Sequence, residues 1–467
     1  MKTAFDFFNN YLSQNIIDSD ILERMHDVIA EFSARAPKMI VMKCIDGRVH
    51  GSAQKGYPPT SVVYGRTDGN KVSLEKSNFW YWNRIDRVVK DAYFNTPLTP
   101  AIFIAYMHHS KMGLGCASHN SNAEEALKSI EQQMKEVRAT FTESELFVLG
   151  GDTETDAMTD TLIFMDGTRI DSAEIIEYCN LKNPIDVFHQ AFTGKKIDDI
   201  ATCRNIGHKT PKELLSGENP IFFSNLDICL NMQNYLMHTI TTCVRKDRSE
   251  LYRFIRPDIL DLIFDKLASV SISENLLGPL VYQIVWNIAF SLNHQKLISN
   301  MSEAEKIAQL DHAEELACYG DGFETLPRNK AVLVKTGRGN DVEALQVSKN
   351  VLQKNRARYH QDHKLLVHIN IEVNGQMTRW DDFNNSVGSR ILTMQRNVEN
   401  VFGEDVAILT SYSYRSQKRF YPLKISRSDS RLVYPVDVVG PINSRTKFSN
   451  LALNAEEALY RMGFFKK

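Results

Sequence analysis

An excess of charge of one sign is what this 467-residue chain most plainly lacks. Its 55 basic and 57 acidic side chains leave a net charge of −2, so we expect neither nucleic acid nor an anionic membrane surface as a partner. Residues 1–25 contain no basic segment followed by a clean apolar core, so we expect no signal peptide. These absences predict a cytoplasmic globular protein.

Cysteine is scarce and unevenly placed. The chain has seven cysteines and none after residue 318: Cys44, Cys116, Cys179, Cys203, Cys229, Cys243 and Cys318. An odd, scattered set argues against a disulfide framework and favours a reducing compartment. We expect most of them to be small buried apolar residues, and only Cys44 and Cys116 stand apart because of their positions.

Long apolar runs are also missing. The most apolar window, residues 276–292, is interrupted by glycine, proline, glutamine and asparagine, and it is shorter than the roughly 20 residues of a membrane-spanning helix. We therefore expect a buried core helix there and no membrane span.

The sequence that is present alternates between apolar strands and amphipathic helices. Continuous apolar runs predict strands at 38–44, 101–108 and 145–151, and helical periodicity predicts a helix at 122–141. This order is typical of an α/β fold with a parallel sheet covered on both faces. The spacing of Ser121 and Glu124 predicts a capping box at the start of the helix.

We divide the chain into four segments. Residues 1–35 read as an N-terminal helical segment, with Phe5, Phe8, Leu12 and Ile16 on one face. Residues 36–225 form the α/β domain, residues 226–320 a helical connection, and residues 321–467 a second α/β domain.

The second α/β domain repeats the pattern of the first. Residues 330–340 align with 38–48 without a gap, and a strand at 364–373, a helix at 386–402 and a strand at 405–414 follow in the same order. We interpret this as an internal duplication. Where the first copy has Cys44, Asp46 and Arg48, the second has Thr336, Arg338 and Asn340, so it cannot repeat thiolate chemistry.

Metal-binding residue types collect at the ends of two predicted strands. Cys44 ends the first, and His108, His109 and Cys116 follow the second, in a loop that contains Gly113 and Gly115. Two thiolates and one imidazole form a zinc ligand set that leaves a fourth position open. Side chains alternate along a strand, so only one of the two adjacent histidines can face the ion. Taken singly, each residue could instead belong to the core or to an anion site at a helix N-terminus.

Asp46 and Arg48 would complete such a site. The carboxylate of Asp46, two residues from Cys44, could itself bind the metal and occupy the fourth position. If Arg48 instead holds this carboxylate in a bidentate pair, the fourth position stays available to water. The alternative is a turn ion pair of little energetic weight.

These residues resemble a known family. C-x-D-G-R at 44–48, G-C-A-x-H at 115–119 and G-x-D-T-x-T-D-A at 150–157, with a weaker match at 312–329, are similar to the β-carbonic anhydrases and more closely to their divergent branch, the carboxysome shell carbonic anhydrases. The resemblance implies a β-carbonic-anhydrase-like sheet covered by helices, internally duplicated, with a degenerate second copy that has lost its zinc. Residues 36–225 would then be the catalytic domain.

The same resemblance implies roles for individual residues. Cys44, Cys116 and one histidine would bind Zn²⁺. Asp46 and Arg48 would be the gating pair, in which the arginine holds the carboxylate away from the metal and so leaves the fourth position to water. His108 is favoured over His109, because H-x-S at 108–110 resembles the strand end of that branch.

The implied activity is reversible hydration of CO₂ to bicarbonate by zinc-bound hydroxide, the reaction of a lyase. The family further suggests a homodimer or larger assembly and the supply of CO₂ to Rubisco inside a carboxysome, with the shell or Rubisco as partner. His50 and His119 are candidates for the proton shuttle because they lie near the motifs.

Two alternatives stay open. The chain would be a non-catalytic shell or scaffold protein if its zinc were structural or vestigial, or it would act on another small electrophile such as COS or CS₂. Residues 152–157 have no role predicted beyond shaping the rim of the site or holding an interface.

Overall fold

The structure is a computed structural model that separates into two compact units. One comprises Arg24–Ala313 and the other Met1–Glu23 with Glu314–Lys467. The predicted division into four segments stays a prediction. The structure describes residues 15–44, 49, 51–59, 61–67, 79–95, 99–111, 115–189, 226–302, 345–346, 349, 365–373, 387–403, 406–414, 419–425 and 432–433.

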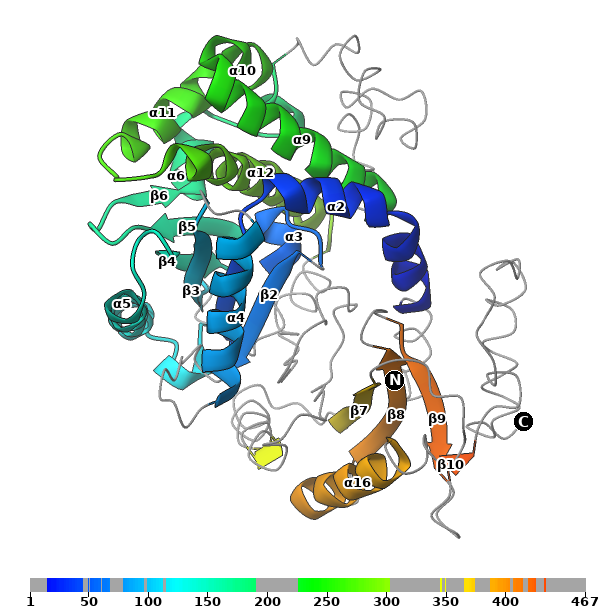
Figure 1. Ribbon diagram of the computed structural model, residues 1–467. Helices are drawn as coiled ribbons and strands as arrows, with labels where there is room; N and C mark the ends of the chain where they lie inside the picture. Colours follow the sequence, from blue (N-terminus) through cyan, green and yellow to red (C-terminus); the bar gives the residue numbers. More distant parts are fainter. Residues whose placement is uncertain are drawn as a thin grey trace. The chain divides into compact units, whose positions relative to one another are not determined.

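The larger unit is built on a six-stranded, mostly parallel sheet (Figure 1). Strands β1 to β4 are mutually parallel where they pair, and β5 and β6 are added antiparallel at one edge, in the order β2-β1-β3-β4-β5-β6. The fold is therefore α/β, as predicted. The strands are β1 (Met39–Cys44), β2 (Val62–Thr67), β3 (Ala101–His109), β4 (Leu146–Glu154), β5 (Thr159–Ile163) and β6 (Arg169–Asp171).

Helices cover both faces of this sheet, which explains why its central strands are apolar at successive positions. Phe103 and Ala105 of β3 pack with α4 (Phe79–Asn95) and α5 (Ala123–Thr140). Ile102 and Ile104 belong to the opposite core, together with helices α2 (His26–Arg35), α9 (Leu226–Lys246) and α12 (Glu274–Ser299) (Figure 1). Shorter helical elements are α3 (Gly51–Lys55), η2 (Ala117–His119), α6 (Ser172–Tyr178) and η3 (Pro184–Val187).

The predicted helix after β3 is confirmed, but its predicted cap is wrong by one residue. Asn122 caps α5, and its side chain accepts hydrogen bonds from the backbone N–H groups of Glu124 at 3.0 Å and Glu125 at 3.2 Å. Ser121 has a left-handed backbone with φ of 59°, and its N–H donates to the carbonyl of Cys116. The tight loop before the helix therefore moves the cap one residue along.

Residues 226–302, the described part of the central region, are mainly helical, as predicted. Two of the helices are α10 (Arg248–Phe254) and α11 (Pro257–Leu267), which are separate because Pro257 cannot continue the hydrogen-bond ladder and begins a new helix instead. Among the described residues, α12 is the one helix long and apolar enough to cross a membrane, and 83% of its apolar window is buried inside the protein. That burial agrees with the core helix predicted there.

The smaller unit contains a four-stranded sheet in the order β10-β9-β8-β7. Its elements are β7 (Leu365–Val373), α16 (Ser389–Phe402), β8 (Val406–Tyr414), β9 (Tyr421–Ile425) and β10 (Leu432–Val433). The N-terminal segment joins this unit: the side chain of Asn15 accepts a hydrogen bond from the N–H of Phe420, and Asp20 pairs with Arg419. Phe5, Phe8, Leu12, Thr336, Arg338 and Asn340 lie outside the described residues.

The two sheets share a strand order and a register. In each, a parallel strand pair joined by a helix is followed by two antiparallel strands. Ala101 pairs with Leu146 and Leu365 with Val406, so both parallel pairs align their first residues. His108 and Glu372 are consequently equivalent, each the eighth residue of its strand.

A glycine in β4 allows the close packing of a buried ring. A Cβ atom at Gly151 would lie 2.1 Å from Cδ2 of Tyr106, and the Lys55 ammonium also lies over this ring, 3.4 Å from its centroid. We expect Gly151→Ala to lower the free energy of unfolding by about 1–3 kcal/mol, because the ring has no free volume to enter. Urea denaturation measures the change.

Thr140→Ala, on the exposed end of α5, is the control and should shift stability by less than about 0.5 kcal/mol. Equal stability of Gly151→Ala and the wild type would show that the Tyr106 ring can move aside.

Candidate metal centre

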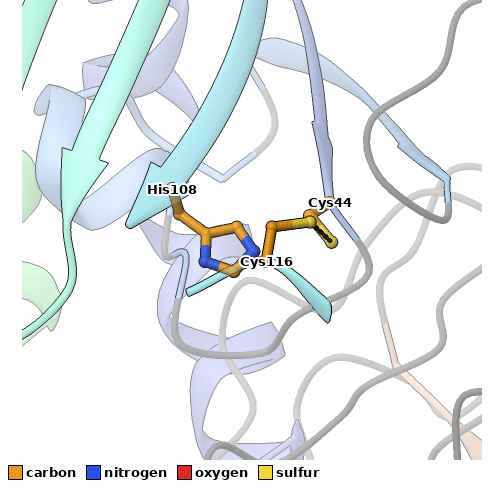
Figure 2. A group of neighbouring side chains, drawn as sticks. All are labelled: Cys44, His108 and Cys116. Carbon is orange, nitrogen blue, oxygen red and sulfur yellow. Dashed lines mark hydrogen bonds between the residues drawn. The ribbon is translucent and has the colours of Figure 1, made fainter. Parts of the chain in front are cut away.

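Three predicted ligands come together at one edge of the larger sheet (Figure 2). The sulfur atoms of Cys44 and Cys116 and a ring nitrogen of His108 all lie within 4.8 Å of one another, and all three residues are buried. Within the described residues this is the one group of three or more such side chains able to hold a metal ion.

The sheet itself places two of these residues. Cys44 is the last residue of β1 and His108 the last but one of β3, and the two strands are parallel neighbours with Met42 paired to Ala105. Because parallel strands end at the same edge of a sheet, a thiol and an imidazole far apart in the sequence become adjacent.

A tight loop brings the third residue to them. The carbonyl of Cys116 accepts hydrogen bonds from the N–H groups of His119 at 3.1 Å and Ser121 at 2.9 Å, which closes the 3-10 turn η2. A Cβ atom at residue 115 would lie 3.2 Å from the Cα of Ser121, so glycine relieves the crowding where the loop returns. Gly113, predicted to help this loop fold, lies outside the described residues.

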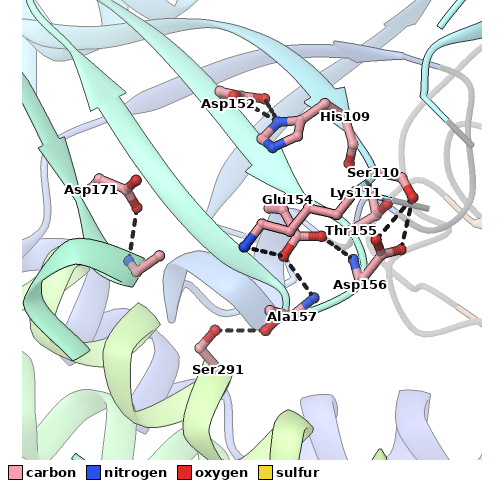
Figure 3. A network of polar contacts seen from close by, with 11 residues as sticks. His109, Ser110, Lys111, Asp152, Glu154, Thr155, Asp156, Ala157, Asp171 and Ser291 are labelled. Carbon is pink, nitrogen blue, oxygen red and sulfur yellow. Dashed lines mark hydrogen bonds and ion pairs between the residues drawn. The ribbon is translucent and has the colours of Figure 1, made fainter. Parts of the chain in front are cut away.

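The neighbouring histidine faces elsewhere. Nδ1 of His109 lies 3.0 Å and 2.9 Å from the two carboxylate oxygens of Asp152 on β4 (Figure 3). This hydrogen bond raises the pKa of His109, against the opposing effect of partial burial. Strand alternation and this contact together leave His108 beside the sulfurs, so the geometry favours the histidine that the sequence favoured.

The sulfur atoms have the spacing of ligands that share an ion. They are 3.8 Å apart, which agrees with the edge of about 3.8 Å in a tetrahedral site whose zinc–sulfur bonds are about 2.3 Å. Disulfide sulfurs would be only about 2.05 Å apart, and both cysteines are free thiols.

The protonation of the thiols is coupled to the binding of a cation. The hydrogen bond with Cys116, followed by burial, raises the pKa of the Cys44 thiol well above its ordinary value, while His108 acts in the opposite direction. A divalent ion would reverse this preference, because it stabilises both thiolates. The donor set therefore fits a metal ion and is compatible with zinc.

The other predicted site residues are not all described by the structure. Asp46, Arg48 and His50 lie outside the described residues, so the gating pair stays a prediction. His119 is partly exposed in η2, and Cys179 is buried in the opposite core.

The sequence did not predict a buried polar cluster that Lys55, Asp160 and Thr153 form next to His108 in the sheet. Lys55 lies 3.4 Å from a carboxylate oxygen of Asp160, and Thr153, the cross-strand partner of His108, donates to the other oxygen at 2.8 Å. Burial lowers the pKa of Lys55 to about 8, with Asp160 opposing the shift. Lys55 carried no signal in the sequence, because an isolated lysine normally lies on the surface.

Comparison of the chain with models of known protein families and with curated proteins finds no match. The choice of metal and of reaction therefore rests on the residues of the site. What they establish is a buried Cys44–His108–Cys116 group with the chemistry and spacing of a metal centre.

The identity of the imidazole ligand can be tested directly. His108→Ala should weaken Co²⁺ binding by more than about 100-fold, because a removed ligand costs more than the 10- to 100-fold typical of outer contacts. Titration followed by the thiolate-to-cobalt absorption band measures this affinity. His109→Ala is the matched control and should bind Co²⁺ nearly as the wild type does; the reverse ranking would assign the ligand to His109.

Metal affinity should also rise with pH. The raised pKa keeps Cys44 protonated near neutrality, so a binding metal ion must displace at least that proton. Apparent affinity is therefore expected to increase about tenfold per pH unit for each proton displaced. Competition titrations with a chelator between about pH 6.5 and about pH 8.5 measure the slope; a flat profile would mean that Cys44 is already a thiolate in the metal-free protein.

Proposed function

We propose that this chain is a zinc-dependent carbonic anhydrase, a lyase that interconverts CO₂ and bicarbonate at the Cys44–His108–Cys116 centre. The observation that carries the proposal is the convergence of two thiols and one imidazole at the carboxyl edge of a parallel sheet, next to the C-x-D-G-R motif that begins at Cys44. Three protein donors, rather than four, are typical of zinc sites that do chemistry.

The roles of the residues follow from their chemistry. Zinc held by these donors would lower the pKa of a water in its remaining position toward about 7, which is the activation that hydration of CO₂ requires. Cys44 and Cys116 supply negative charge, and His108 adds a neutral donor. Arg48 would hold the carboxylate of Asp46, keeping it from the metal and available to accept a proton from the reacting water.

The smaller unit supports the proposed kinship. Its sheet repeats the strand order of β3 to β6 and the register of the parallel pair β3–β4, and we infer that the two arose from one duplicated unit. Glu372 stands where the first copy has His108, and residues 321–467 contain no cysteine. Such a copy cannot form the same centre, which fits the zinc-free C-terminal domain of the carboxysome shell carbonic anhydrases.

The same resemblance extends the proposal to the setting of the reaction. As a member of that branch, the chain would act as a homodimer or larger assembly and supply CO₂ to Rubisco within a carboxysome. These statements rest on the shared motifs at 44–48, 115–119 and 150–157.

Stopped-flow measurement of CO₂ hydration tests the activity. The zinc-loaded protein should accelerate hydration, and Cys44→Ala or Cys116→Ala should reduce the rate to that of buffer, because each removes a charged ligand. Cys179→Ala, which changes a buried cysteine of the opposite core, is the control and should keep the activity.

Two results would overturn the proposal. A protein that holds stoichiometric zinc but hydrates CO₂ no faster than buffer would be a scaffold with a structural metal. Rapid conversion of COS or CS₂ without hydration of CO₂ would assign the site to another small electrophile.

A further inference from the structure

The acidic segment 152–157, for which the sequence suggested only the rim of the site or an interface, contacts each of the three residues that follow His108 (Figure 3). Asp152 binds the ring of His109. The Ser110 hydroxyl is 2.9 Å from each carboxylate oxygen of Asp156, and Lys111 lies 3.9 Å from Glu154. The contacts thus follow the chain from the end of β3 into the loop that leads to Cys116.

The backbone of this segment reinforces the same contact. The N–H and the hydroxyl of Thr155 both donate to the carbonyl of His109, at 2.9 Å and 3.0 Å. The ladder between β3 and β4 ends with the pair His109–Glu154, so the contacts of Thr155 and Asp156 extend it past the strand. They hold a part of the chain that the sheet no longer holds.

The segment is itself anchored. The carboxylate of Glu154 accepts hydrogen bonds from the N–H groups of Asp156 at 2.8 Å and Ala157 at 3.2 Å. Ser291 of α12 donates to the carbonyl of Ala157 at 2.7 Å (Figure 3). Asp156 therefore projects from a turn whose backbone is tied to the core of the unit.

The contacts of Lys111 and Ser110 with this segment differ in how much energy they contribute. The side chain of Lys111 is 74% exposed, and an exposed ion pair at this distance contributes little. The Ser110–Asp156 contact is partly buried and joins a hydroxyl to a carboxylate, which makes it a strong hydrogen bond. Of the two, the second is able to fix the position of the chain.

We propose that Asp156 is a positioning residue of the metal centre, which acts through Ser110 to hold the end of β3 so that His108 and Cys116 present their donors to the same ion. Ser110 lies between these two ligands in the sequence and two residues after the first. The proposal rests on the metal-binding part of the proposed function and not on the hydration of CO₂.

Four variants test it: Ser110→Ala, Asp156→Ala, Ser110→Thr and Lys111→Met. Co²⁺ affinity and the visible spectrum of the cobalt form are measured for each, together with the urea unfolding midpoint. Ser110→Ala and Asp156→Ala should each weaken Co²⁺ binding about 10- to 100-fold, as loss of an outer contact does. Both should shift the cobalt bands, because the ligands would no longer meet at the tetrahedral positions.

Two controls separate positioning from general stability. Ser110→Thr keeps the hydroxyl and should restore affinity and spectrum, whereas Lys111→Met removes only the exposed pair and should match the wild type. The double variant Ser110→Ala with Asp156→Ala should bind no more weakly than either single variant, because the two residues act through one contact.

Wild-type affinity and spectrum in Ser110→Ala and Asp156→Ala would overturn the proposal, as would additive losses in the double variant. If Asp156→Ala does not fold, Asp156→Asn takes its place with the same expected direction. Because cobalt binding is measured without substrate, a protein that binds the metal as described but does not hydrate CO₂ would refute the proposed activity alone.

Discussion

The parallel pairing of β1 with β3 is the constraint on which the candidate centre depends. It brings the last residue of one strand, Cys44, beside His108 near the end of the next, although 64 positions separate them in the sequence. The helices on both faces serve this arrangement, because a parallel sheet needs apolar cover on each side. The three donors are themselves buried, which strengthens every electrostatic interaction within the site.

The interior near this edge of the sheet contains buried polar groups that bond to one another. Asn287 of α12 accepts a hydrogen bond from the N–H of Asp160 at 2.9 Å and donates to the carbonyls of Met158 at 3.3 Å and Gln54 at 3.4 Å. It thereby joins α3, which follows the C-x-D-G-R segment, to the turn between β4 and β5. The helix that the sequence predicted as a buried core helix therefore also connects two parts of the chain that border the site.

The shared register of the parallel strand pairs in the two sheets is what a duplicated unit would show, even if only one copy keeps the site. A strand pair, its connecting helix and two added strands can be repeated without repeating the chemistry, because the sheet depends on apolar pattern and the site on a few residues at strand ends. At the position equivalent to His108 the second sheet has Glu372. The fold of a duplicated copy would therefore survive the loss of its ligands.

The sequence by itself predicted strands at 38–44, 101–108 and 145–151, close to β1, β3 and the first part of β4, together with the helix between the last two and the residue types of the centre, because periodicity and chemistry are local properties. Only the tertiary structure decided that His108 and not His109 lies beside the sulfurs, that Asn122 caps α5, and that Asp156 reaches Ser110. It also decided that Lys55 is buried against Asp160. Each of these depends on a partner supplied by another strand or by the path of a loop, and a one-dimensional pattern does not contain that information.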